Sequence, residues 1–161
     1  MNKRYLVLGA AAAMVALIVA ALVLDCVRLA DGARRRLELA DQELAKHEQR
    51  LVKLLGGSGK ATPEVQQAIA AYEAPAPASK RHDAYEKLVA AFRQTMQVDV
   101  DPTDPLGRKF MDDVAGAINR REAAEAPYDV ELAAYREYLG SARGAVARRF
   151  SSAARDGWGE K

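Results

Sequence analysis

The chain begins with an unbroken hydrophobic segment. After four residues, two of them basic, twenty uncharged residues run from Tyr5 to Leu24, and Asp25 closes the run. A helix rises about 1.5 Å per residue, so roughly 20 residues cross a hydrocarbon core of about 30 Å. A helix also satisfies its own backbone polar groups, as lipid requires. The pattern predicts an N-terminal membrane anchor over residues 1–25.

Two other readings of this segment are a cleaved secretory signal and a lipid attachment site at Cys26. The run is longer than the roughly 7 to 15 apolar residues of a signal peptide, and no Ala-x-Ala site follows it. Asp25 stands where lipid attachment normally needs a small residue. We therefore expect an uncleaved single-pass anchor. Basic residues flank both sides of it, so the sequence leaves open which side of the membrane holds the C-terminal part.

The segment after the anchor predicts one long helix over residues 26–55. Leu37, Leu44 and Leu51 recur every seven residues, which is the spacing of a coiled-coil seam. The glycine-rich stretch 56–59 ends the helix, because glycine readily adopts the left-handed conformation found there. The offset positions that we expect beside the leucines on the seam are Ala33, Ala40, His47 and Leu54.

Further helices follow, each with a recognisable start. Thr62 precedes a proline and an acid, which is a typical N-cap sequence. After an Ala-Pro stretch, Ser79 provides the next cap, and Asp104 before a second proline provides another. In the last helix Pro127 either introduces a kink or starts a new helix. The predicted ranges are 62–73, 79–97 and 104–155.

These helices predict an all-α fold, in which the anchor leads into a small antiparallel bundle over residues 26–161 with a coiled-coil-like first helix. Alanine is abundant and β-branched residues are sparse in this part of the chain, which favours helix over strand. Helical spacing places large apolar side chains on shared faces. The expected core consists of Tyr85, Leu88, Phe92, Phe110, Val114, Ile118, Tyr128, Leu132 and Tyr135.

The charge balance limits the range of partners. The chain has 24 Lys and Arg against 22 Asp and Glu, for a net charge of +2. A protein normally meets nucleic acid with a strongly basic face, so we expect no nucleic-acid partner. Cys26 is the only cysteine, so the chain holds no internal disulfide.

The C-terminal helix resembles that of the LemA family. The matching features are Asn119 followed by an arginine, an aromatic residue at Tyr128 and a tyrosine at Tyr135, together with the Ala-Lys-His-Glu stretch that includes His47. The arginine-rich motif of the family's first helix is absent here, and Pro127 falls inside the matching helix. The resemblance implies a bacterial, membrane-anchored, non-enzymatic helical protein.

Residues that could carry chemistry are few. His47 and His82 have no neighbour at metal-ligand spacing; we expect His47 to set helix register and His82 to be solvated. Asp99, Asp101 and Asp104 share a loop but lack the glycine and glutamate of a calcium-binding loop, so turn and capping roles are favoured. Adjacent acids on a helix point in different directions, which separates Asp112 from Asp113.

Two other motifs carry little weight. The glycine-rich stretch ending at Lys60 lacks the strand and the hydroxyl residue of a phosphate-binding loop. No serine has a histidine spaced to suggest activation, although the sequence leaves spatial triads open; the serines considered are Ser58, Ser79, Ser141, Ser151 and Ser152. We therefore assign no catalytic, cofactor-binding or metal-binding residue and expect no enzyme or cofactor.

The C-terminal tail combines basic and aromatic residues. Such a combination is typical of helices at the surface of anionic lipid, but cations are also favourable at any helix C-terminus, which is the simpler explanation. The residues concerned are Arg143, Val146, Arg148, Arg149, Phe150, Arg155 and Trp158.

Two functional hypotheses follow from these patterns. The first is a membrane-anchored scaffold or adaptor in the bacterial inner (plasma) membrane, which contacts the lipid bilayer and binds a protein partner, or itself, through its helices. The alternative is an envelope-spanning coiled-coil accessory protein of division or lysis. The identity of the partner, the oligomeric state and the biological process cannot be read from the sequence.

Overall fold

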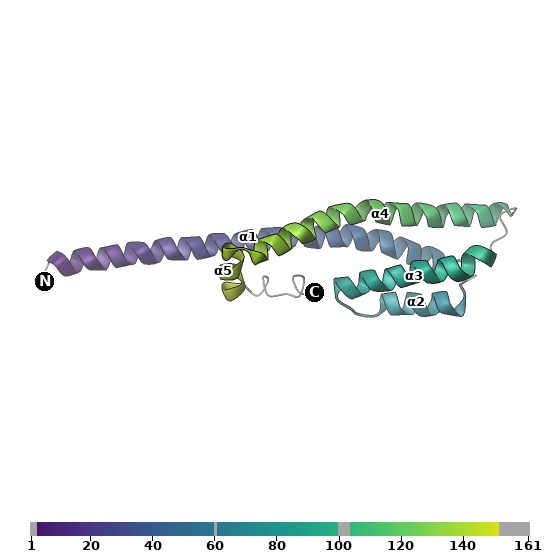
Figure 1. Cartoon of the computed structure of the whole chain (residues 1–161), viewed down its shortest axis with the longest axis horizontal. Helices are drawn as coiled ribbons and strands as arrows, with labels where there is room; N and C mark the ends of the chain where they lie inside the picture. The colour runs from purple at the N-terminus through teal and green to yellow at the C-terminus, as the bar shows by residue number, and fades with distance from the viewer. Residues whose placement is uncertain (1–2, 60, 100–103, 152–161) are drawn as a thin grey trace. The chain divides into compact units, whose positions relative to one another are not determined.

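The computed structural model describes residues 3–59, 61–99 and 104–151, with side chains for 9–59, 61–95 and 104–151. These residues form helices and no β-strand, which confirms the all-α prediction. Figure 1 shows each helix in turn. Their bounds are α1 Lys3–Gly57, α2 Pro63–Glu73, α3 Ala78–Asp99, α4 Pro105–Gly140 and α5 Ala142–Phe150.

Two of the predicted helix starts are present as capping interactions. The Thr62 side chain accepts the Val65 N–H at 3.4 Å, and a proline occupies the first turn of α2. The Asp104 carboxylate accepts the Leu106 N–H at 3.2 Å and the Gly107 N–H at 3.1 Å. These bonds satisfy backbone donors that have no partner inside a helix.

Other helix ends differ from the sequence prediction. α3 begins at Ala78 rather than after Ser79, because the Pro77 carbonyl accepts the Arg81 N–H at 3.1 Å. α4 continues through Pro127, so this proline neither ends nor starts a helix. The break in the predicted 104–155 helix falls at Ser141, whose side chain accepts the Gly144 N–H and caps α5.

α1 carries the apolar segment and the following predicted helix as one element (Figure 1). Among the described helices it is the one long and apolar enough to cross a membrane, by length and composition. No residue of its most apolar 18-residue window is buried against the rest of the protein. From Gly9 onward, where side chains are described, the segment contributes nothing to a protein core, and its apolar side chains face outward.

The buried face of α1 confirms one half of the predicted seam and corrects the other. Leu37, Leu44 and Leu51 are fully buried, as their spacing predicts. Of the four predicted offset positions, Ala33 is buried as expected, whereas Ala40, His47 and Leu54 are only partly buried. From Leu37 onward the buried offset positions lie four residues after each leucine. The buried offset residues are Asp41, Glu48 and Leu55. Two of the three positions are acidic, which the sequence analysis did not foresee.

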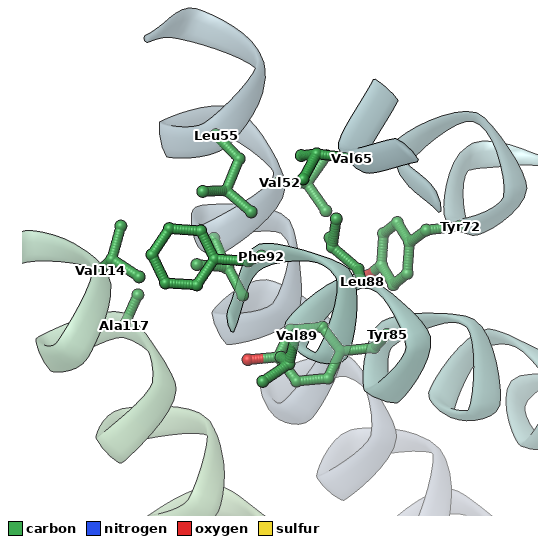
Figure 2. Close-up of a cluster of buried hydrophobic side chains, with 11 residues drawn as sticks. Val52, Leu55, Val65, Tyr72, Tyr85, Leu88, Val89, Phe92, Val114 and Ala117 are labelled. Carbon is green, nitrogen blue, oxygen red and sulfur yellow. The ribbon is translucent and has the colours of Figure 1, made fainter. Parts of the chain in front are cut away.

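The described residues divide into two compact units. The range 26–161, which was predicted as one domain, falls partly in each of them. One unit contains Ala40–Tyr128. Its core joins apolar side chains from four helices that point toward one another in Figure 2. Edge-to-face aromatic pairs, Tyr72 with Tyr85 and Phe92 with Phe110, each have ring centroids 6.5 Å apart. The remaining buried members of this core are Leu51, Val52, Leu55, Val65, Leu88, Val89, Val114 and Ala117.

Most of the predicted core residues are buried, and three are not fully so. Phe110, Ile118 and Leu132 are half-buried. Phe110 and Ile118 pack against the core of Ala40–Tyr128 from its side. The buried members of the prediction are Tyr85, Leu88, Phe92, Val114, Tyr128 and Tyr135.

The other unit contains α1 up to Leu39, α4 from Asp129 onward, and α5. Polar contacts connect its helices. The Tyr138 hydroxyl donates to the Cys26 carbonyl at 2.5 Å, and Arg36 pairs with Glu131 at 3.2 Å. The apolar residues buried in this unit are Cys26, Ala30, Ala33, Leu37, Tyr135, Leu139 and Ala147.

Gly144 allows α5 to fold back against the end of α4. A Cβ at this position would lie 2.1 Å from the Tyr138 carbonyl oxygen and 2.6 Å from the Leu139 Cα. Both are backbone atoms, so the neighbour cannot move aside by changing a rotamer. The absence of a side chain at Gly144 is therefore a requirement of the α4–α5 corner.

We predict that Gly144→Ala weakens the docking of α5, with Gly140→Ala as the matched control because a Cβ at Gly140 meets nothing within 4 Å. Overpacking of this kind costs about 1–3 kcal/mol, so amide hydrogen exchange in residues 142–150 should accelerate roughly 5- to 150-fold. Mass spectrometry of the full chain in mild detergent measures the exchange. Equal exchange in the two variants would refute the steric argument.

Candidate functional site

The main concentration of charge inside the unit Ala40–Tyr128 is a group of five side chains from three helices. We call this group the buried charge cluster: Asp41 and Glu48 from α1, Arg81 and His82 from the first turns of α3, and Arg121 from α4. The two acids lie seven residues apart on the buried face of α1. The cluster therefore occupies two consecutive core positions of that helix.

Glu48 lies at the centre of the cluster, and its side chain is 0 % exposed. One carboxylate oxygen, Oε1, is 2.7 Å from His82 Nδ1 and 3.7 Å from Arg121 Nε. The other, Oε2, accepts the Tyr72 hydroxyl at 3.2 Å and lies 3.5 Å from Arg81 Nε. Three basic side chains and one hydroxyl thus replace the water that a carboxylate loses on burial.

His82 connects the two acids of α1. Its Nδ1 meets Glu48, and its Nε2 lies 3.2 Å from Asp41 Oδ1 in an ion pair that lacks hydrogen-bond alignment. Arg81 Nη2 donates to the same Asp41 oxygen at 2.6 Å. The His82 ring also packs edge-on against Tyr128, with centroids 5.0 Å apart. These contacts hold the start of α3 against α1.

Arg121 is the member of the cluster that comes from α4, and it also contacts two acids outside the cluster. Its Nη1 is 2.6 Å from Glu125, which is partly exposed, and 3.2 Å from Glu86, which is exposed. Its guanidinium carbon lies 5.0 Å from the centroid of the Tyr85 ring, a cation–π contact. The Tyr85 hydroxyl is buried and has no hydrogen-bond partner among the described residues. It borders a hollow of about 290 Å³ that Arg121 and Glu125 also line.

The cluster changes the acidity of its members. Burial alone lowers the pKa of His82, but the adjacent Asp41 and Glu48 carboxylates outweigh it and raise that pKa to about 9. Burial alone raises the pKa of Asp41, but His82 and Arg81 hold it below its usual value. Burial, and then the Glu48 charge, raises the pKa of Tyr72. At neutral pH the cluster therefore holds charged His82, charged Asp41 and a protonated Tyr72.

This geometry is suited to holding helices together. The three cationic groups of the cluster face carboxylates, and Glu48 has no exposed surface through which a substrate could reach it. Within the described ranges, no three His, Cys, Asp or Glu side chains are placed to hold a metal ion. A hollow of about 400 Å³ borders the cluster on the side of Tyr72 and Arg81, and the Ala-Pro stretch 74–76 helps to line it.

Comparisons with known proteins add no family to this geometry. No family model matches the chain, and no curated protein or solved structure does. The resemblance to the LemA family stays a prediction carried by the residues quoted for it.

The structure reverses the roles predicted for the two histidines. His82, predicted as solvated, has a side chain that is only 13 % exposed and lies inside the cluster. The lysine, arginine and aspartate beside it in the sequence suggested a polar surface, but its partners come from α1. His47, predicted on the seam, lies one position away from it and lines a hollow of about 440 Å³ with other residues of α1.

The remaining candidates fall outside any shared site. Asp104 caps α4 as predicted, while Asp101 and the side chain of Asp99 lie outside the described residues. Asp112 and Asp113 are both exposed. Ser58 donates to the Leu55 carbonyl at 2.8 Å, Ser141 caps α5, and Ser151 contacts Asp31 at 3.4 Å. Three further candidates, Ser152, Arg155 and Trp158, lie outside the described residues.

Four of the five cluster residues were not predicted from the sequence: Asp41, Glu48, Arg81 and Arg121. The available signal was the spacing on α1, where Asp41, Glu48 and Leu55 repeat every seven residues in the same register as the leucines. Basic residues at the start of the third helix were the complementary signal. An acid that recurs on an apolar stripe predicts a buried partner of opposite charge.

We predict that Glu48→Gln destabilises the protein strongly, whereas Glu43→Gln does not. Removing one member of a buried ion pair costs about 3–5 kcal/mol, because the remaining charges stay buried without compensation. Glu43 lies on the same helix and its side chain is 64 % exposed in a pair with Lys46, so its loss should cost about 0.5 kcal/mol or less. Urea unfolding of both variants in mild detergent measures the difference. Equal midpoints would contradict the central role of Glu48.

We also predict a pH dependence that His82 carries. Its folded pKa of about 9 lies above the ordinary value of 6.5, so its contribution is fully present below pH 6.5 and is lost as pH rises through 9. The loss is about 3 kcal/mol at most. Unfolding free energies between pH 6 and pH 10 should show it in the wild type.

The matched variants for this measurement are His82→Gln and His47→Gln. His82→Gln should lack the decline that the wild type shows between pH 6 and pH 10. His47→Gln, which leaves the cluster intact, should retain it. A decline of equal size in the His82 variant would show that other groups are responsible.

Proposed function

We propose that this protein is a single-pass, membrane-anchored helical scaffold or adaptor, which acts by binding another protein. The observation that carries the proposal is the outward-facing apolar segment of α1, continuous with a helix whose later residues enter a packed core. Burying such a segment in lipid removes its apolar surface from water. The bacterial inner membrane is the location that we propose for it.

A non-enzymatic role is supported by how the protein uses its charged groups. Catalysis needs an acid, base or nucleophile that a substrate can reach. The most perturbed groups described here contact one another inside the helical core, and Glu48 is fully buried. This arrangement supports rigid positioning of helices, which is what a protein-binding surface requires. A LemA-like assignment agrees with this role.

The surface that we propose for a partner is the basic face of α1. Lys46, Arg50 and Lys53 follow one another at helical spacing and, with His47, Gln49 and Leu54, line the hollow of about 440 Å³. Residues three and four apart share one face of a helix. A cationic strip of this kind complements an acidic protein segment. Leu44 and Leu51 are buried in the protein itself, so charges at those positions would report on folding rather than on binding.

We predict that the full chain stays in the membrane pellet after alkaline carbonate washing, whereas a chain that begins at Val27 is soluble. The reason is the apolar run from Tyr5 to Leu24, whose insertion as a transmembrane helix is effectively irreversible. Immunoblotting of pellet and supernatant measures the distribution. A mature protein that starts near Cys26 by mass spectrometry would contradict the anchor and favour a cleaved signal.

We predict that Lys46→Glu, Arg50→Glu and Lys53→Glu together abolish recovery of an acidic partner after crosslinking and detergent solubilisation. Charge reversal on a complementary surface turns attraction into repulsion. The matched control reverses three exposed lysines on other helices: Lys80, Lys87 and Lys109. Both variants should remain helical by circular dichroism. Equal recovery with either variant would refute the basic face as the binding surface.

A further inference from the structure

The short helix α5 differs from the other helices in both its position and its surface. It belongs to the same unit as the first part of α1, and Figure 1 shows it turning away from the line of α4. Its nine residues include three arginines and no acid. Its last residue, Phe150, is exposed. The charges of α5 and its aromatic side chain are therefore accessible, unlike those of the buried charge cluster.

Contacts within this unit fix where α5 lies along α1. The Tyr138 hydroxyl, just before α5, donates to the Cys26 carbonyl at 2.5 Å. The Ser151 hydroxyl, just after α5, lies 3.4 Å from an Asp31 carboxylate oxygen. Gly144 packs against the backbone of α4 between these two points. Both ends of α5 are thus tied to a short stretch of α1.

That stretch follows directly after the apolar segment, which ends at Leu24. At about 1.5 Å per residue, Cys26 lies roughly 3 Å beyond Leu24 along the helix, and Asp31 lies roughly 10 Å beyond it. The polar interface of a bilayer extends several ångströms past the hydrocarbon core. If the apolar segment spans the membrane, α5 lies at the depth of the lipid headgroups.

The exposed side chains of α5 suit that environment. Arg143, Arg148 and Arg149 are exposed and make no ion pair with any described residue. The helix dipole favours cations at a C-terminus, which accounts for Arg148 and Arg149. It disfavours a cation in the first turn, where Arg143 lies, so the dipole does not explain the whole set. The three arginines point to different sides of the helix, so an anionic layer that surrounds α5, as lipid headgroups do, favours all three.

We propose that α5 is an interfacial helix that binds the headgroups of anionic lipids through Arg143, Arg148 and Arg149, with Phe150 lying among the same headgroups. This inference rests on the proposed membrane anchor. It adds a second, reversible membrane contact that depends on lipid charge, whereas the anchor depends only on apolar burial. The contact would orient the C-terminal part of α4 with respect to the bilayer surface.

Single-tryptophan variants of the full chain test the proposal in lipid nanodiscs. Trp158, the only tryptophan, is first replaced by phenylalanine. Tryptophan is then introduced at Phe150, at Leu22 inside the apolar run, or at Leu39 on α1, which are 61 %, 61 % and 63 % exposed. The nanodiscs contain phosphatidylcholine with bromine atoms near the headgroup, with or without phosphatidylglycerol. Bromine quenches tryptophan fluorescence only at close range.

We expect quenching at Leu22→Trp in both lipids, no quenching at Leu39→Trp, and quenching at Phe150→Trp that increases with phosphatidylglycerol. Leu39 lies roughly 22 Å beyond Leu24 along α1, which places it outside the reach of the bromines. Changing Arg143, Arg148 and Arg149 to glutamine should shift the docking equilibrium of Phe150→Trp by on the order of fivefold per arginine. Changing Lys87, Arg93 and Arg120, which are exposed on other helices, to glutamine removes the same charge elsewhere and should leave quenching unchanged.

The two controls separate the failure of this proposal from the failure of the anchor. If Leu22→Trp is quenched and Phe150→Trp is no more quenched than Leu39→Trp, the interfacial helix is refuted while the anchor stands. If Leu22→Trp is not quenched, the anchor fails, and the interfacial helix fails with it. Quenching at Phe150→Trp that ignores both lipid charge and the three arginines would refute the recognition of anionic headgroups.

Discussion

The packing of the unit Ala40–Tyr128 depends on the burial of one carboxylate, that of Glu48. An isolated charge in a protein interior costs several kcal/mol, and only close partners of opposite charge offset that cost. The partners come from three other helices: Tyr72 from α2, Arg81 and His82 from α3, and Arg121 from α4. An arrangement of these helices that separates Glu48 from its partners leaves a buried charge uncompensated. The apolar core around Glu48 cannot take the place of these partners, because apolar groups do not offset the cost of burying a charge.

An apolar core and a charged cluster select structures in different ways. Leucine, valine and phenylalanine tolerate small shifts in packing, because apolar contacts are not directional. The hydrogen bond between His82 and Glu48 is directional, and the other ring nitrogen of His82 must also lie beside Asp41, which is one heptad earlier on α1. A shift of α3 by a single residue would break both. We infer that the cluster fixes helix register while the apolar core supplies most of the stabilisation, as buried polar groups do in some coiled coils.

The sequence predicted the helices better than the faces that they bury. Caps at Thr62 and Asp104 are local signals, so the start of α2 and that of α4 could be predicted from a few residues. The seam of α1 could not, because the leucine spacing fits two offset registers, and the apolar alternative leads to His47 instead of Glu48. Choosing correctly required knowing that Arg81, His82 and Arg121 meet that helix. Long-range pairing of this kind leaves little local trace, which is also why His82 was predicted as solvated.

The net charge of +2 conceals two populations of charged residues with different physical roles. In the unit Ala40–Tyr128, basic groups are buried against acids, and their charge is neutralised inside the protein. On α5, three arginines are exposed without an ion pair among the described residues, so their charge is available to an external anion. A near-zero total therefore argues against a uniformly basic surface but says nothing about a local one. Beside an apolar helix, a local excess of arginine is the feature that responds to lipid charge, because attraction to an anionic surface decays within about 10 Å.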